Sequence, residues 1–275
     1  MRQSGKMCRE RCRVALEICT LHADLRDMAT ELSTPDLDRD ISEIAKRYRK
    51  ASGVGIQVLN LVGGQAENLM ERLPDPVKER LEDATTKALN FALNAASRSR
   101  GVVPDQKSWL NTAAATAMGA AGGAGGLPTA LAELPVTTTV LLRAIQGIAA
   151  EYGFDPNQPE IQAECIQVFA AAGPLAADDG ADMGFLSARV TLSGTTVHGI
   201  IARVAPRLSA ALGQKLAAQT VPIIGAVAGA ATNYAYTSYY QEMAHVHFGL
   251  MRAGKAHKLP RDTLVLRLAD AVKSL

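Results

Sequence analysis

Apolar residues recur at every third or fourth position along most of the chain, the spacing that places them on one face of an α-helix. The stretch that begins at Pro35 shows this pattern, with one face formed by Leu37, Ile41, Ile44 and Tyr48. Alternating apolar and polar residues, the pattern of a strand, are scarce. We therefore predict an all-α protein, a multi-helix bundle with an Ala- and Gly-rich buried helical core.

The same spacing predicts where the helices of the second half lie. We expect helices over 109–126, 131–152, 159–172, 178–204, 207–220, 223–253 and 262–274. Pro135 falls inside the second of these, and a kink is expected there because proline removes a backbone donor.

Charge is distributed unevenly along the chain. Residues 1–100 contain 17 Lys or Arg and 15 Asp or Glu, whereas residues 108–241 contain 5 and 8. The first part is therefore predicted to form solvated amphipathic helices and the second a buried core. The net charge of +2 and the aromatic content of 4% argue against a nucleic-acid partner, which favours a concentrated basic surface or a stacking platform.

Two uncharged runs, 108–132 and 216–241, are long enough to raise the question of a membrane span. They consist largely of Ala, Gly, Thr, Asn and Gln and are interrupted by Pro128 and Pro222, so they are poor candidates for insertion into lipid. We expect both to be packed inside the protein. Because small residues four apart let backbones approach closely, the two runs are expected to meet, directly or through a shared neighbour.

Cysteine usage and the N-terminus predict a reducing, cytoplasmic location. Cys8, Cys12 and Cys19 recur at helical spacing rather than in a loop-rich disulfide framework. The first twenty residues contain scattered charges and lack the apolar run of a signal peptide. A basic run that includes Arg252 and Lys255 leaves peripheral contact with the inner face of the membrane open.

Two groups of residues have spacings that suggest a metal site. Cys8, Cys19 and His22 lie on one predicted stripe, but Cys8 and Cys19 would be about 16 Å apart on a helix, too far for one zinc ion. Glu242 and His245 have the Glu-x-x-His spacing of di-metal bundles, which need two such motifs. The chain has one, so no metal ligand is assigned and the sequence identifies no cofactor.

A few polar side chains stand inside the charge-poor half. Glu133 and Arg143 are the two charged residues between Lys107 and Glu151. A buried charge must be paired or hydrogen-bonded, so each is expected to meet a partner or to face a ligand cavity.

The last long predicted helix adds a polar stripe. Asn233, Tyr236, Tyr240 and His247 follow one another at spacings of three, four and seven residues, which places them on one helical face. With Glu133 and Arg143 this stripe could line a ligand-binding pocket. The alternative is a self-satisfied structural network that fixes the register of the helices.

The order of several short motifs resembles the EcsC protein family. The motifs are Leu127-Pro128, Glu133-Leu134-Pro135-Val136-Thr137-Thr138, Leu142-Arg143-Ala144-Ile145, Cys165-Ile166-Gln167-Val168-Phe169-Ala170, Val221-Pro222-Ile223-Ile224-Gly225 with Gly229 and Asn233, and Ala244 with His247-Phe248. They cover about residues 74–255. This resemblance divides the chain into N-terminal amphipathic helices (1–73), an EcsC-like helical core (74–255) and a short C-terminal helix (256–275). The sequence departs from the family pattern at 171–174, after the Phe-Ala segment.

The resemblance implies a link to transport. The family is named for the third gene of a cluster whose other two genes encode the ATPase and membrane parts of an ABC transporter. The family motif falls on Glu133, Arg143, Asn233 and His247, the residues that the burial argument selects.

Three functional hypotheses follow, and whether the protein is an enzyme stays open among them. The first is a non-enzymatic accessory or binding protein, peripheral to the membrane and linked to an ABC transporter, that holds a lipid-like or other small ligand. The second is a metal-dependent hydrolase that uses Glu133 and His247. The third is a structural partner of a transporter that docks through its N-terminal helices.

Overall fold

The computed structural model describes residues 35–62, 71, 73–100, 108–124, 126–171, 173–174, 186, 197–219 and 225–275. These residues form eight α-helices, one short 3-10 helix and no strand, which confirms the prediction of an all-α bundle. Cys8, Cys12 and Cys19 lie outside the described residues, as does most of the predicted helix 178–204.

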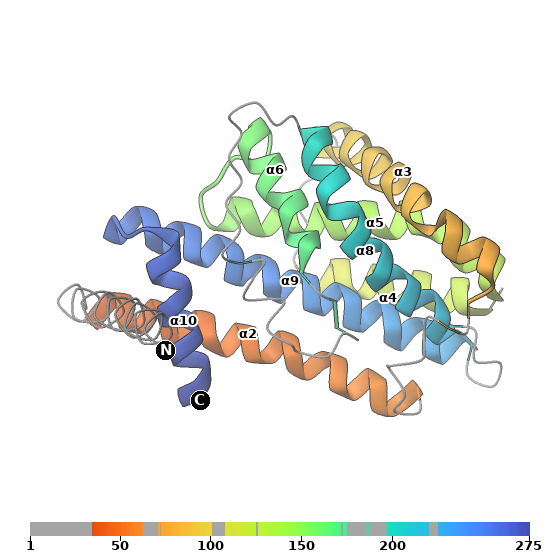
Figure 1. Ribbon diagram of the computed structural model, residues 1–275, viewed down its shortest axis with the longest axis horizontal. Coiled ribbons are helices and arrows are strands. Elements are labelled where there is room, and N and C mark those ends of the chain that lie inside the picture. The colour runs from red at the N-terminus through yellow and green to blue at the C-terminus, as the bar shows by residue number, and fades with distance from the viewer. Residues whose placement is uncertain are drawn as a thin grey trace, which may run out of the picture.

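One long helix forms the centre of the bundle. The elements in chain order are α2 (Pro35–Val62), α3 (Asp75–Arg100), α4 (Ser108–Ala124), α5 (Gly126–Glu151), α6 (Pro159–Gln167), η2 (Val168–Ala170), α8 (Val197–Gln219), α9 (Gly225–His257) and α10 (Arg261–Ser274). Helix α9 contacts α2, α4, α5, α8, η2 and α10, and it crosses the middle of the molecule in Figure 1. Every residue from 239 to 250 is buried, including four polar ones, so this part of α9 is enclosed on all sides rather than along one stripe.

The two uncharged runs pack against each other, as predicted. Asn233 Nδ2 on α9 donates to the carbonyl oxygen of Ala115 on α4 at 2.8 Å, and Thr112 Oγ1 donates to Gln241 Oε1 at 3.2 Å. These two contacts set an antiparallel register that carries the end of α4 toward the first turns of α9. Within the described ranges, no helix combines the length and apolar character that crossing a bilayer requires.

Two helices continue through internal prolines. Helix α5 is helical from Gly126 to Glu151 through Pro135, and α8 continues through Pro206. The predicted break between 204 and 207 is therefore wrong. Val204 and Leu208, on either side of this proline, are buried, and their burial offsets the roughly 3 kcal/mol that an internal proline costs a helix.

Gly173 lies in the loop at which the sequence departs from the family pattern. Its φ is +95°, a backbone conformation that residues with a Cβ rarely adopt. A Cβ built there would lie 3.0 Å from the Cβ of Ala211 on α8. Both the backbone angle and the close approach of α8 therefore require glycine.

Helix α2 is held against α9 by a nearly buried carboxylate. Glu242, whose side chain is 9% exposed, accepts from Lys50 Nζ at 2.6 Å and from Arg47 at 2.9 Å. Both cations belong to α2, so the bridge joins segments almost two hundred residues apart in the chain.

We expect Glu242→Gln to loosen α2. The substitution removes the charge that both cations approach, which should cost about 1–2 kcal/mol and increase amide hydrogen exchange over residues 37–51. Asp83→Asn is the matched control because it removes an exposed pair with Lys87, where a loss below about 0.5 kcal/mol is expected. Hydrogen-exchange mass spectrometry measures both, and equal protection of α2 in the two variants would contradict the clamp.

Candidate functional site

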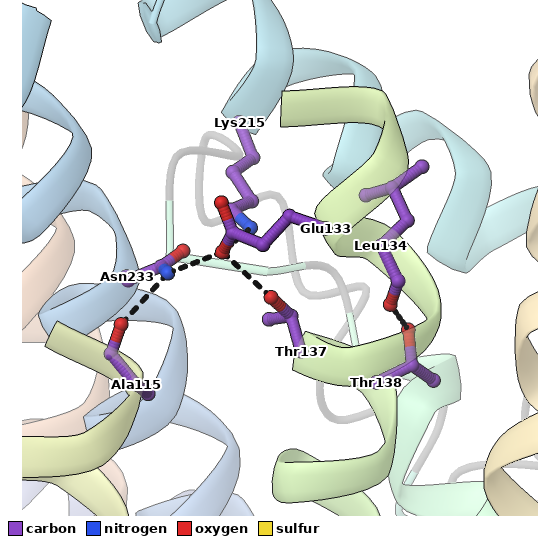
Figure 2. A network of polar contacts seen from close by, with 7 residues as sticks. All are labelled: Ala115, Glu133, Leu134, Thr137, Thr138, Lys215 and Asn233. Carbon is purple, nitrogen blue, oxygen red and sulfur yellow. Dashed lines mark hydrogen bonds and ion pairs between the residues drawn. The ribbon is translucent and has the colours of Figure 1, made fainter. Parts of the chain in front are cut away.

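Buried and partly buried polar residues between positions 133 and 261 form two separate groups of contacts. We call the first the Glu133 cluster, formed by Glu133, Thr137, Lys215 and Asn233, and the second the His247 cluster, formed by Glu164, His247 and Arg261. The Glu133 cluster lies where α5, α8 and α9 meet near α4, and Figure 2 shows its members converging from these helices.

In the Glu133 cluster, one carboxylate oxygen collects three donors. Glu133 Oε1 accepts from Thr137 Oγ1 at 2.7 Å, from Asn233 Nδ2 at 2.7 Å and from Lys215 Nζ at 3.4 Å (Figure 2). Thr137 lies one helical turn after Glu133, so α5 presents both side chains on one face. The arrangement joins three helices through a single atom.

The charged pair at the centre of this cluster is removed from water. The Lys215 side chain is 0% exposed and that of Glu133 is 8% exposed. Burial lowers the pKa of Lys215, and the neighbouring Glu133 carboxylate offsets only part of this effect. In a buried ion pair, the cost of removing both charges from water is about as large as their mutual attraction. The pair therefore adds little net stability, which favours a specific role for it.

Two oxygen atoms of the cluster have no hydrogen-bond partner in the part of the chain that the structure describes. Asn233 Nδ2 donates both to Glu133 Oε1 and to the carbonyl of Ala115, which fixes the orientation of the amide. Its Oδ1, and Oε2 of Glu133, are buried and unpartnered among the described residues. In Figure 2 both atoms lie on the side of the cluster away from Thr137. The pair can accept hydrogen bonds from N–H or O–H groups.

Tyr236 and Tyr240, the two tyrosines of the predicted stripe, hold the helices beside this cluster together. Tyr236 donates its hydroxyl to the carbonyl of Ala211 at 2.5 Å, one turn before Lys215 on α8. Tyr240 packs against the rings of Tyr236 and Phe169, at centroid distances of 6.4 and 5.3 Å. Burial raises the pKa of Tyr236 well above its ordinary value, so its phenol keeps its proton and binds α9 to α8.

His247 belongs to a different group of contacts. The Arg261 guanidinium can only donate, so His247 Nδ1 accepts its hydrogen bond at 2.9 Å. The ring therefore carries its proton on Nε2 and donates to Glu164 Oε2 at 2.8 Å. Arg261 also donates to the carbonyl of Leu186 at 2.6 Å. Both ring nitrogens are occupied, which identifies His247 as a buried link between α6, α9 and α10.

The electrostatics of the His247 cluster agree with a neutral imidazole. Burial and the Arg261 charge lower the pKa of His247, and Glu164 opposes them only in part. Burial alone would raise the pKa of Glu164, but the hydrogen bond and charge of His247, together with Arg261, leave it below its ordinary value. At neutral pH the cluster therefore consists of a carboxylate, a neutral histidine and a guanidinium.

The structure does not bring all the predicted site residues together. Asn233, which contacts Glu133, precedes His247 by 14 residues of one helix, about 21 Å along its axis. Ligands of one zinc ion lie within roughly 4 Å of each other, so a hydrolase centre that combines Glu133 and His247 has no geometric basis. The six predicted residues are also spread along their helices, since Arg143 lies about 15 Å beyond Glu133 along α5. In the described part of the chain, no group of three or more His, Cys, Asp or Glu is placed to hold a metal.

Two residues that complete these clusters were not predicted. Lys215 is the single charged residue between Arg207 and Glu242, and Glu164 stands alone between Glu160 and the aspartates at 178–179. Isolation in an apolar stretch, the signal that identified Glu133, therefore also marks both of them. Which isolated charges pair depends on helix packing, which spacing along the chain does not specify.

Fold and site together define a class: an all-α protein with a central helix, α9, that is buried from residue 239 to residue 250, and with a polar cluster enclosed between helices. The sequence profile of the EcsC protein family matches residues 102–252, and the chain belongs to this family. The match includes all four residues of the Glu133 cluster, whereas α2, α3 and α10 lie outside it. No curated protein and no solved structure matches the chain.

Proposed function

We propose that the protein is a non-enzymatic binding protein whose Glu133 cluster holds a small ligand or the polar head of a lipid-like one. The observation that carries the proposal is the pair of buried acceptors, Glu133 Oε2 and Asn233 Oδ1, that have no partner among the described residues. A ligand that presents an ammonium or hydroxyl group would donate to both.

The alternative is a network that serves only to fix helix register. A network of that kind is expected to satisfy its own members, because a buried polar atom without a partner costs about 1–3 kcal/mol. Among the described residues, two acceptors of the Glu133 cluster are unpaired, whereas a single oxygen, Glu133 Oε1, accepts hydrogen bonds from three donors. This uneven distribution favours a bound donor over a purely structural role.

Membrane attachment and a transporter partner contribute less to the proposal. The basic run near the C-terminus is largely engaged within the chain: Arg252 lies over the ring of Tyr152, Lys255 over that of Phe154, and Arg261 contacts His247. The proposed ligand is therefore defined by the buried cluster and not by a charged surface. Flotation with anionic liposomes at low salt tests membrane contact separately.

We expect binding to require a hydrogen-bond donor on the ligand. Short-chain phosphatidylethanolamine, whose ammonium carries N–H groups, should bind and raise the melting temperature, whereas phosphatidylcholine of the same chain length, whose quaternary ammonium carries none, should not. Native mass spectrometry of the protein purified without detergent should also show a stoichiometric small-molecule adduct. Both signals should be lost in Asn233→Ala and kept in Asn94→Ala, an exposed asparagine of α3.

Three results would overturn the proposal. The first is the absence of any adduct together with no response to phosphatidylethanolamine. The second is equal binding of the two phospholipids, since the unpartnered acceptors would then play no part. The third is an experimental structure in which one ordered water satisfies both Glu133 Oε2 and Asn233 Oδ1.

A further inference from the structure

A second candidate site lies at the junction of α2, the end of α5 and α9. A cleft of about 280 Å³ opens there, with Ile44 and Arg47 from α2, Tyr152 from the turn after α5, and His245 and Gly249 from α9 among its lining residues. Helix α2 lies outside the family match, whereas His245 and Gly249 of α9 lie within it. The cleft is therefore formed between the family core and a helix that packs onto this core.

An unsatisfied histidine lines this cleft. The His245 residue is 8% exposed, and its Nδ1 has no hydrogen-bond partner among the described residues. The ring packs edge-to-face against Tyr152 at a centroid distance of 5.7 Å. Burial and the nearby Arg47 lower the pKa of His245 to about 4, so the ring is neutral at pH 7 and offers one donor and one acceptor nitrogen.

The cations that line the cleft already have partners. Arg47 is held by the Glu242 carboxylate at 2.9 Å. The Arg252 guanidinium lies over the face of the Tyr152 ring, 4.7 Å from its centroid. Each of these two charges is therefore partly balanced or covered by a contact within the chain.

The carboxylates that line the cleft are less occupied. Asp40 has one long contact, 3.4 Å to His257 Nε2. Glu43 and Glu151 reach the cleft from α2 and from the end of α5, and neither forms a hydrogen bond or ion pair within the described ranges. Three carboxylates and two arginines thus line the cleft, and among the described residues Glu43 and Glu151 are the charges that have no contact of their own. Ile44 and Tyr152 add apolar and aromatic surface to the lining.

We infer that this cleft binds an organic cation, a primary ammonium or guanidinium group on a short aliphatic stem. The cationic group lies between Glu43 and Glu151, the stem covers Ile44 and the Tyr152 ring, and one N–H group donates to the His245 ring. Inorganic cations fit less well, because the cleft offers apolar and aromatic surface that such ions do not use.

Titration calorimetry with putrescine and agmatine at low ionic strength tests this inference. We expect saturable one-site binding by the full-length protein, weakened about tenfold by Glu43→Gln and by Glu151→Gln, and abolished by the double variant. Glu82→Gln is the matched control because Glu82 is exposed on α3 and does not line the cleft, so it should leave the affinity unchanged. Both substituted glutamates are exposed as well, so the variants should fold normally, as circular dichroism would verify.

A second readout follows His245 itself. Adding putrescine should shift the imidazole ¹⁵N signals of one histidine, identified by their loss in His245→Gln. The inference is overturned if neither diamine nor agmatine binds, if binding ignores the two glutamates, or if citrate binds instead and is lost in Arg252→Gln. Because His245 lies 12 residues beyond Asn233, about 18 Å along α9, Asn233→Ala should leave amine binding intact, which separates this site from the proposed function.

Discussion

Glu133→Ala should destabilise the protein by about 3–5 kcal/mol, the largest single-residue loss that we expect. The substitution leaves Lys215, which is fully buried, without the carboxylate that balances its charge. It also removes the acceptor shared by Thr137 and Asn233. Urea unfolding followed by circular dichroism at 222 nm measures the loss.

The double variant Glu133→Ala/Lys215→Met distinguishes a stranded charge from a lost contact. If the cost comes from a lysine left charged in an apolar environment, removing the lysine as well should restore most of the stability, because a methionine of similar shape needs no partner. In the single variant, stability should also rise with pH, since the unfolded chain holds a lysine proton more tightly than the folded chain does. A double variant less stable than Glu133→Ala would show that the ion pair is not the source of the effect.

The helices were predictable because their pattern is local. Leu37, Ile41 and Ile44 repeat at helical spacing and are buried together on α2, so burial in the fold agrees with the period of the sequence. The prediction failed at Pro206, where local chemistry favours a break but buried residues on both sides hold one continuous helix. Tertiary packing there outweighs the preference of a single residue.

The site was predictable in its parts and not in its grouping. Isolation in an apolar stretch identified Glu133 and Arg143, and helical spacing identified Asn233 and His247. Sharing a face does not imply sharing a site, however, because a 33-residue helix is about 50 Å long. Asn233 and His247 therefore meet different neighbours, and those neighbours come from α4 and α5 in one case and from α6 and α10 in the other.

The two proposed sites also differ in how much of each lies within the family match. The Glu133 cluster lies wholly within the matched residues, whereas the amine cleft needs Glu43 of α2, which lies outside them. The proposed function of the Glu133 cluster therefore depends only on residues that the family profile covers. The cleft would add a property that depends on how α2 packs onto α9, so Glu242→Gln, which loosens α2, should weaken amine binding while leaving binding at the Glu133 cluster unchanged.

Acid should destabilise the protein well above the pH at which carboxylates usually titrate. The pKa of His245 is lowered from 6.5 to about 4, chiefly by burial, and that of His247 is also lowered. Between these values and 6.5 the unfolded chain binds protons that the folded chain does not, so stability falls as pH falls through this window. For His245 alone the drop corresponds to about 3 kcal/mol by pH 4. The lowered pKa of Glu164 adds a loss of the same sign below pH 4.5.

His245→Gln separates this effect from general acid denaturation. A glutamine does not titrate, so the variant should lose less stability between pH 6.5 and 4 than the unaltered protein, even if it is less stable at pH 7. His198→Gln, which removes an exposed histidine of α8, is the matched control. Urea unfolding at half-unit steps of pH gives the slopes, and parallel curves for the protein and for His245→Gln would mean that this ring takes up its proton equally well in the folded and unfolded chain.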